Sequence, residues 1–304
     1  MEIHFSNVNF SSNSGPNSFA HRLADQLTSM GHNIVNENES YNAALIFIEP
    51  ASKLNKSARI VQRLDGIWFK PDQFYTHNVG IKQTYDSSDH IIWQSEFDKK
   101  MTYHHWGDRP GSIIHNGILL NNVDVTLPEI LKIRDSYQYM FVCSANWHRQ
   151  KRLKENIELF FKLKEKYPSS CLVIMGSNPD CSINHNDIFY TGSISHSVCL
   201  QIFSSADWMI HLAWLDHCPN VVVEALSQNC PVICNDSGGT REIVRDNGII
   251  IKENKSYNFE LVDYDRPYRL NIPSLGLPII EVDNSYLDIK KVAQKYARVL
   301  GGIN

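Results

Sequence analysis

The chain has 304 residues, 42% of them hydrophobic and 20% charged, which is a globular composition and excludes disordered, collagen-like and coiled-coil proteins. Its formal net charge of −4 gives no basic excess, which argues against a nucleic-acid-binding protein held by phosphate contacts. The length is more than one ordinary core accommodates, so two domains are predicted.

The sequence gives no sign of export, of a disulfide framework or of a zinc site. No apolar run approaches the roughly 18 residues that span a bilayer, and residues 1–5 lack the pattern of a signal peptide. The seven cysteines are scattered without a CxxC pair, so neither a disulfide framework nor a zinc site is predicted. We expect a cytoplasmic protein without a transmembrane segment, which leaves peripheral membrane contact open.

Short apolar runs alternate with helical patterns in the first part of the chain. A helix is expected where Phe19, Leu23 and Leu27 recur at helical spacing, and Gly31 can end it. Strands are predicted at 3–5, 43–48, 58–62, 91–93 and 112–114. Strands separated by helices are typical of βαβ units with a parallel sheet.

The same rhythm restarts after an interruption near residues 118–137. Further strands are predicted at 140–143, 171–175, 188–190, 209–212, 231–234 and 249–251. We therefore expect one α/β domain over 1–118, a linker over 119–137 and a second α/β domain over 138–282. A last helix, over about 283–304, would be free to pack back on the first domain.

Two familiar phosphate-binding fingerprints are absent, because the chain has neither GxxxxGK[ST] nor GxGxxG after a strand. A polar loop that contains Gly15 does lead from the first predicted strand into a helix, and a helix start attracts phosphate. An ordinary capped turn is the alternative for this loop.

Three later loops carry the other candidate residues. Residues 144–153 contain Asn146 and the cations Arg149, Lys151 and Arg152 before a helix, where cations oppose the helix dipole and are suited to a diphosphate. Asp216 and Glu224 flank seven residues that include Asn220 and Val221, and Gly238-Gly239 follows the next strand. A solvated helix start, a surface loop with one isolated glutamate and a tight turn are the plain alternatives.

The ordered string Asp216 to Leu226, Pro231-Val232-Ile233, Gly238-Gly239 and Glu242 resembles the nucleotide-sugar half of retaining GT-B glycosyltransferases of family 4. In the first half the resemblance is looser and rests on Gly15, on residues 94–97 and on residues 114–118. The resemblance implies two Rossmann-like domains with parallel sheets facing a central cleft. It also implies sugar transfer, with retention, from a nucleotide-diphosphate sugar to a hydroxyl acceptor such as a glycan or glycolipid.

The resemblance further implies roles for individual residues. Lys151, with Arg149 or Arg152, would neutralise the leaving diphosphate, Glu224 would hold the ribose, and Asp216 would contact the sugar. Backbone N–H groups of Asn220 and Val221, together with Gly15 and Gly238-Gly239, would approach the phosphates. No cofactor or metal is expected, UDP or GDP is the expected nucleotide of the donor, and the acceptor would bind the first domain.

Three departures from the family pattern leave alternatives open. Asp216 replaces a glutamate, Asn146 stands where an arginine is usual, and Asp65 is the candidate for a contact that a histidine makes in many members. The first two favour a second hypothesis, a catalytically weak nucleotide-sugar-binding partner subunit. A metal-dependent reaction has one indication, Asp263-Tyr264-Asp265, which lies outside the nucleotide-binding pattern.

Overall fold

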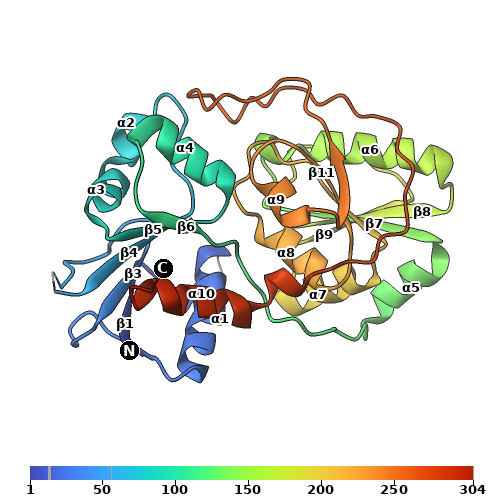
Figure 1. Ribbon diagram of the computed structural model, residues 1–304. Coiled ribbons are helices and arrows are strands. Elements are labelled where there is room, and N and C mark those ends of the chain that lie inside the picture. Colours follow the sequence, from blue (N-terminus) through green and yellow to red (C-terminus); the bar gives the residue numbers. More distant parts are fainter. Residues whose placement is uncertain (13–14, 56, 304) are drawn as a thin grey trace. The chain divides into compact units, whose positions relative to one another are not determined.

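The computed structural model describes residues 1–12, 15–55 and 57–303, which form two compact units (Figure 1). Unit 1 comprises residues 1–119, 258–262 and 285–304, and unit 2 comprises residues 120–257 and 263–284. No helix within the described ranges is long and apolar enough to cross a membrane.

Unit 1 is built on a six-stranded parallel sheet with the order β2-β1-β3-β4-β5-β6. Its strands are β1 (Glu2–Ser6), β2 (Asn33–Val35), β3 (Ala43–Phe47), β4 (Arg59–Leu64), β5 (His90–Trp93) and β6 (Gly111–Ile113). Its helices are α1 (Gly15–Ser29), α2 (Phe74–His77), α3 (Val79–Ser87), α4 (Glu96–Trp106) and α10 (Ile289–Leu300), which a short 3-10 turn (Ser285–Leu287) precedes.

Alternation along the strands sends side chains to two helical layers of unit 1. Ile92 packs into a core with α1 and α10, in which the rings of Phe19 and Tyr296 lie 5.8 Å apart. The next residue, Trp93, points to the other face, where its Nε1 donates to Thr102 of α4 at 2.8 Å. The C-terminal helix is thus part of the core of unit 1, although the chain passes through unit 2 before it.

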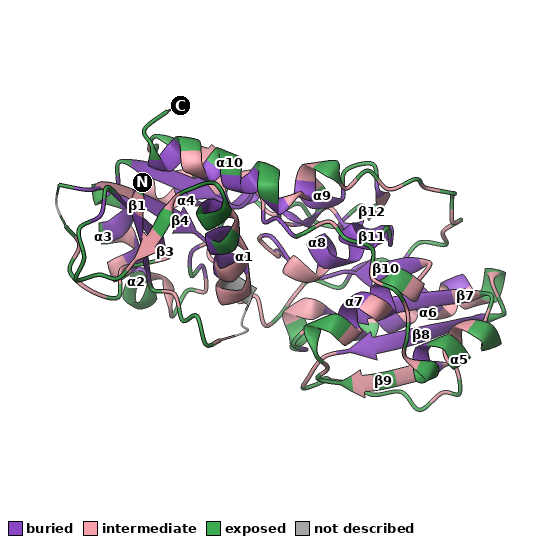
Figure 2. Cartoon of the chain, turned by 90° about the horizontal axis from the view of Figure 1, so that it is seen from below, coloured by how far each residue is buried: buried purple, intermediate pink, exposed green. Residues whose placement is uncertain are grey.

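Unit 2 has a second six-stranded parallel sheet, with the order β12-β11-β10-β7-β8-β9. Its strands are β7 (Tyr139–Ser144), β8 (Ser170–Met175), β9 (Ile188–Gly192), β10 (Trp208–His211), β11 (Val232–Asn235) and β12 (Gly248–Ile251). Its helices are α5 (Pro128–Ser136), α6 (Leu153–Lys166), α7 (His196–Ser205), α8 (Asn220–Ser227) and α9 (Thr240–Val244), and a 3-10 turn (Arg149–Lys151) precedes α6. Figure 2 shows that both sheets are largely buried.

Two segments differ from the elements expected from the sequence. Residues 128–136, inside the expected linker, form α5 of unit 2, because Pro128 preorganises a helix start and Ile130 is buried. The edge strand β2 was not expected, because only three residues pair with β1. The Pro-containing segment after Glu253 has no regular element in the structure, and its Leu270 and Ile272 are buried in the core that includes α6.

Candidate functional site

Three loops of unit 2 meet at one edge of its sheet. They follow β7, β10 and β11, which are adjacent and parallel, so all three leave from carboxyl ends. Open α/β sheets bind ligands at this edge. The loops carry most of the residues singled out from the sequence.

Backbone hydrogen bonds join the first two loops. The amide N–H of Trp214 donates to the carbonyl of Gln150 at 2.8 Å, and the side-chain amide of Gln150 donates back to the carbonyl of Trp214 at 2.9 Å. Since both carbonyl groups and both donors are paired, the loop after β7 and the loop after β10 have a fixed spacing.

The loop after β11 is attached in the same way. Asn235, the last residue of β11, donates from Nδ2 to the carbonyls of Leu212 and Ala213 at 2.8 and 3.0 Å. The N–H of Gly239 donates to the carbonyl of Asp216 at 2.7 Å. Asn235 is 1% exposed, so these bonds lie away from water and hold the loop firmly.

At the centre of the three loops, Lys151 and Asp216 form an ion pair. Lys151 Nζ lies 2.5 Å from Asp216 Oδ2, and their side chains are 20% and 13% exposed. The same carboxylate oxygen lies 3.3 Å from Nε2 of His211, the last residue of β10. Asp216 therefore joins a lysine from the loop after β7 to a histidine from β10.

The electrostatics of this group favour an ionised Asp216 beside a neutral His211. Burial raises the pKa of the Asp216 carboxyl, but the Lys151 ammonium and the His211 ring outweigh burial and hold this pKa far below its usual range. Burial lowers the pKa of His211, and the Lys151 charge adds to that, although Asp216 opposes both. A neutral His211 that donates to Asp216 carries its proton on Nε2.

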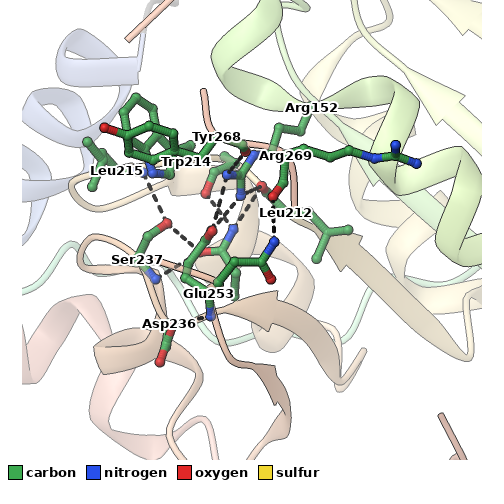
Figure 3. A network of polar contacts seen from close by, with 12 residues as sticks. Arg152, Leu212, Trp214, Leu215, Asp236, Ser237, Glu253, Tyr268 and Arg269 are labelled. Atoms are coloured by element: carbon green, nitrogen blue, oxygen red, sulfur yellow. Dashed lines mark hydrogen bonds and ion pairs between the residues drawn. The ribbon is translucent and has the colours of Figure 1, made fainter. Parts of the chain in front are cut away.

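The other two cations of the predicted clamp have different surroundings. Arg149 is exposed, and no ion pair of its guanidinium is found in the described part of the chain. Arg152 is 1% exposed and lies under the loops, where its guanidinium is bound by the Glu253 carboxylate and by the carbonyls of Leu212 and Tyr268 (Figure 3).

Arg152 is therefore a buried structural residue, and the prediction that it contributes to a diphosphate clamp is not supported by its position. The sequence suggested that role because Arg152 stands beside Lys151. However, Arg152 has a left-handed backbone, with φ of 54°, at the junction between the 3-10 turn and α6. This backbone turns its side chain toward Glu253, whereas Lys151 faces Asp216.

Glu224 lies on α8, the helix that begins with Asn220 and Val221. Its side chain is 11% exposed, and Oε1 lies 3.3 Å from Nε2 of His196 on α7. The first N–H groups of an α-helix have no partner within the helix, so the start of α8 presents backbone donors at the edge where β10 ends.

The paired glycines permit a close approach of two loops. Gly238 has φ of 74°, and a Cβ atom there would lie 2.4 Å from the carbonyl oxygen of Asp216. No other residue type fits without moving the backbone. Gly239 precedes α9 and donates to the same carbonyl, so this turn positions Asp216.

Asn146 occupies the outer part of the loop after β7. Its side-chain oxygen accepts hydrogen bonds from Ser177 Oγ at 3.0 Å and Asn178 Nδ2 at 3.1 Å. Both donors belong to the loop after β8, which is the next strand of the sheet. Asn146 thus links two loops, and its residue is exposed.

Two further candidates belong to unit 1. Gly15 begins α1, after the loop that follows β1. Asp65 follows β4, and its carboxylate accepts a hydrogen bond from the guanidinium of Arg63, which is 1% exposed and also donates to Asn116 at 2.8 Å. Asp65 is thus a counter-ion of a buried arginine.

The partners His211, His196 and Glu253 were not found from the sequence. His211 had a detectable signal, since it is the polar residue with which the buried strand β10 ends. His196 and Glu253 are far from Glu224 and Arg152 along the chain, so no local pattern marks them. Within the described residues, no group of three His, Cys, Asp or Glu side chains is arranged to hold a metal ion, Asp263 and Asp265 included.

Comparison with known proteins shows that part of unit 2 is similar to a known family. The family model described as "Glycosyl transferases group 1" matches residues 129–260, which include the loops after β7, β10 and β11. The matched part of the chain is thus similar to the group 1 glycosyltransferases. No curated protein sequence matches the chain significantly.

Solved structures share the fold of this chain over nearly its whole length. Anabaena Alr3699/HepE, crystallised with UDP-glucose, aligns with a TM-score of 0.66 and 14% identity over 100% of both chains. WaaG, a glycosyltransferase involved in lipopolysaccharide biosynthesis, aligns with a TM-score of 0.60 and 12% identity over 99% of this chain and 92% of its own. AviGT4, a glycosyltransferase involved in avilamycin A biosynthesis, aligns with a TM-score of 0.63 and 14% identity over 99% of this chain and 98% of its own. The fold is GT-B, as the sequence predicted.

Proposed function

We propose that this protein is a glycosyltransferase, which moves a hexose with retention of anomeric configuration. The donor is a nucleotide-diphosphate sugar bound by unit 2, and the acceptor is a hydroxyl group of a molecule bound by unit 1. The observation that carries the proposal is the Lys151–Asp216 ion pair, at the carboxyl edge of the sheet and between two helix starts. UDP is the first nucleotide to test, because HepE was crystallised with UDP-glucose.

In this mechanism Lys151 carries the charge-neutralising role. When the bond between the sugar and the phosphate breaks, negative charge develops on the leaving diphosphate, and a cation already in place lowers that barrier. Asp216 orients the Lys151 ammonium, which would exchange part of this interaction for one with the phosphate. Arg149, which is exposed and close in sequence to Lys151, supplies a second cation.

The other residues would bind the donor rather than react with it. Glu224 would accept hydrogen bonds from ribose hydroxyls, since its side chain is 11% exposed and its nearest ion-pair partner among the described residues is His196. The start of α8, with Asn220 and Val221, would present N–H groups to the phosphates, and so would Gly238. Gly239 would act by holding the turn, because its N–H donates to the carbonyl of Asp216. Asp216 would reach the sugar through Oδ1, because Oδ2 is bound by Lys151 and His211. Oδ1 also accepts a hydrogen bond from the N–H of His217 at 3.1 Å.

The test is turnover with a panel of UDP-, GDP- and ADP-sugars, followed as release of the nucleoside diphosphate. Product anomers assigned by NMR would establish retention, and inversion would contradict it. The same assay in EDTA examines metal independence. Activity that is lost in EDTA and restored by manganese would instead support a metal-dependent reaction at Asp263 and Asp265.

A second function is favoured by one observation, the engagement of Lys151 by a shorter acid than the family usually has. A chain whose Lys151 stayed bound to Asp216 would bind a nucleotide sugar without turning it over and would act as a partner subunit. Donor binding in calorimetry without turnover by the purified chain, together with activity on adding a partner glycosyltransferase, would support this function.

A further inference from the structure

Unit 1 has a hollow of about 970 Å³ that the donor chemistry described above does not use. It is formed by the loops after β1, β2 and β3, three adjacent parallel strands, so it lies at the carboxyl edge of the sheet of unit 1. A volume of this size accommodates a small molecule of several sugar rings. All of its lining residues belong to unit 1.

The loops that form the hollow are held by their own polar side chains. Asn7, with a left-handed backbone at φ of 62°, donates from Nδ2 to the carbonyl of Phe47 at 2.9 Å. The N–H of Ala51 donates to Ser6 Oγ at 3.2 Å, and Glu39 accepts from the N–H of Asn36 at 2.8 Å. Each loop is thus fixed to a neighbour or to itself, and the hollow is a preformed feature of the unit.

The lining is rich in uncharged groups that both donate and accept hydrogen bonds. Five asparagines contribute to it: Asn7, Asn9, Asn17, Asn36 and Asn38. The Asn38 amide and the Glu37 carboxylate have no hydrogen-bond partner in the part of the chain that the structure describes. Sugar hydroxyls, which are donors and acceptors at once, are satisfied by such amides and carboxylates.

One side of the hollow is aromatic. Phe10 is 43% exposed, and it is supported by an edge contact with His21, with ring centres 5.0 Å apart, and by a stacked contact with Phe5 at 6.4 Å. An exposed ring held in place by two others offers a flat apolar surface, on which the apolar face of a sugar ring packs. An isolated exposed phenylalanine would need no such support.

The charge of the hollow selects among ligands. Its described lining contains two carboxylates, Glu37 and Glu39, and no lysine or arginine. A phosphate or a uronate would therefore meet repulsion without a compensating cation. Hydroxyl groups that carry no charge meet no such cost.

We propose that this hollow, formed by the loops after β1, β2 and β3, binds an uncharged, hydroxyl-rich acceptor glycan. This inference rests on the proposed function, in which unit 1 binds the acceptor, and it names the acceptor class as neutral oligosaccharide. Phe10 provides the stacking surface, Asn38 and Glu37 bind hydroxyls, and Glu37 disfavours acidic sugars.

The experiment is binding of a panel of glycans to the full chain, measured by saturation-transfer NMR and calorimetry. The panel contains neutral oligosaccharides of glucose, galactose, mannose and N-acetylglucosamine, and matched oligosaccharides with one uronate. We expect neutral members to bind and their uronate counterparts to bind more weakly. Failure of every neutral glycan to bind a protein that still binds its nucleotide sugar would overturn the inference and leave the proposed function standing.

Variants locate the binding. Phe10→Ala and Asn38→Ala should each lower the affinity for neutral glycans about tenfold. The control variants Tyr75→Ala and Asn122→Ala, at exposed residues, should leave this affinity unchanged. Glu37→Gln should improve uronate binding severalfold with little effect on neutral glycans. An equal loss of glycan affinity in the control variants, or no loss of affinity in Phe10→Ala and Asn38→Ala, would show that the glycan binds elsewhere. Donor affinity should stay constant throughout, so loss of donor binding would count against the proposed function instead.

Discussion

Gly238 lies against the backbone of Asp216 so closely that a Cβ atom would come within 2.4 Å of its carbonyl oxygen and 2.8 Å of its nitrogen. These contacts are to backbone, which cannot rotate aside, and φ at Gly238 is 74°. The position of the Asp216 carboxylate, and through it that of Lys151, thus depends on a residue without a side chain.

Gly238→Ala should therefore disturb the site from a distance. We expect lower stability by about 1–3 kcal/mol, from backbone strain and displacement of the loop, and weaker nucleotide-diphosphate binding. Gly192→Ala is the matched control, since it also has a positive φ, of 66°, but nothing within 4 Å of its Cβ position. Chemical denaturation and calorimetry measure both effects, and equal donor affinity in the two variants would show that the close contact does not position the site.

Lys151→Ala should reduce turnover by about 100- to 1,000-fold, the usual cost of removing one group that stabilises charge in the transition state. It should also destabilise the protein, because Asp216 loses its cation while it remains largely buried. The exposed Lys154→Ala serves as the control.

A double variant separates these two effects. Lys151→Met with Asp216→Asn removes both charges, so we expect it to recover most of the lost stability and none of the lost turnover. Recovery of turnover would mean that Lys151 acts only as the partner of Asp216 and does not contact the diphosphate.

Arg149→Met and Arg152→Met should have opposite signatures. Arg152 is buried with Glu253, so its loss should cost about 3–5 kcal/mol of stability, which is the usual cost of leaving a buried charge unpaired. Arg149 is exposed, so its loss should leave the melting temperature unchanged. It should lower the affinity for the nucleoside diphosphate, and this loss should be larger at low salt. Unchanged diphosphate affinity over a salt series would remove Arg149 from the site.

Glu224→Gln should lower the affinity for the nucleoside diphosphate about tenfold or more, because a hydrogen bond to a charged acceptor contributes about 1.5–3 kcal/mol. Binding of the free nucleobase should change little. Glu165→Gln, at an exposed glutamate of α6, controls for the loss of one negative charge. Equal affinity for a nucleoside diphosphate and its 2′,3′-dideoxy analogue in the unmodified chain would contradict the ribose assignment.

The lowered pKa of His211 should be visible in the pH dependence of stability. Its pKa is lowered in the folded state, so the unfolded chain takes up a proton first as the pH falls below about 6.5. The stabilisation is complete above that pH and is lost as the pH falls toward the folded pKa, with a slope of at most about 1.4 kcal/mol per pH unit. His211→Gln should flatten the stability profile between pH 7 and pH 5, measured by urea denaturation.

Asp216 should contribute to the pH dependence of stability at a lower pH than His211. Its pKa is depressed in the folded state, so its stabilisation is present above its unfolded pKa of about 3.9 and is lost as the pH falls further. Asp216→Asn should therefore change the slope below pH 4 and leave the profile between pH 7 and pH 5 to His211. A change confined to the neutral range would contradict this assignment.

Local patterns in the sequence were sufficient to predict the two parallel sheets and the site loops. Buried strands such as β7 and β8 read as short apolar runs, and the carboxyl ends of parallel strands meet at one edge whatever the details of packing. Lys151 could be singled out because it lies in a cluster of cations before a helix. Asp216 and Glu224 could be singled out as two carboxylates, one in the loop after a strand and one on the helix that follows. The short edge strand β2 was missed, since three residues carry too little pattern.

Only the tertiary structure decided what each charge contacts. Lys151 and Arg152 are neighbours in the sequence, yet the left-handed backbone at Arg152 sends one side chain to Asp216 and the other to Glu253, 101 residues away. Periodicity reports which residues are buried, but the choice of partner for a buried charge depends on which loops meet. The sequence thus determined the fold class and the sheet edge at which the candidate site lies. The packing of the loops determined that Lys151 contacts Asp216 whereas Arg152 contacts Glu253.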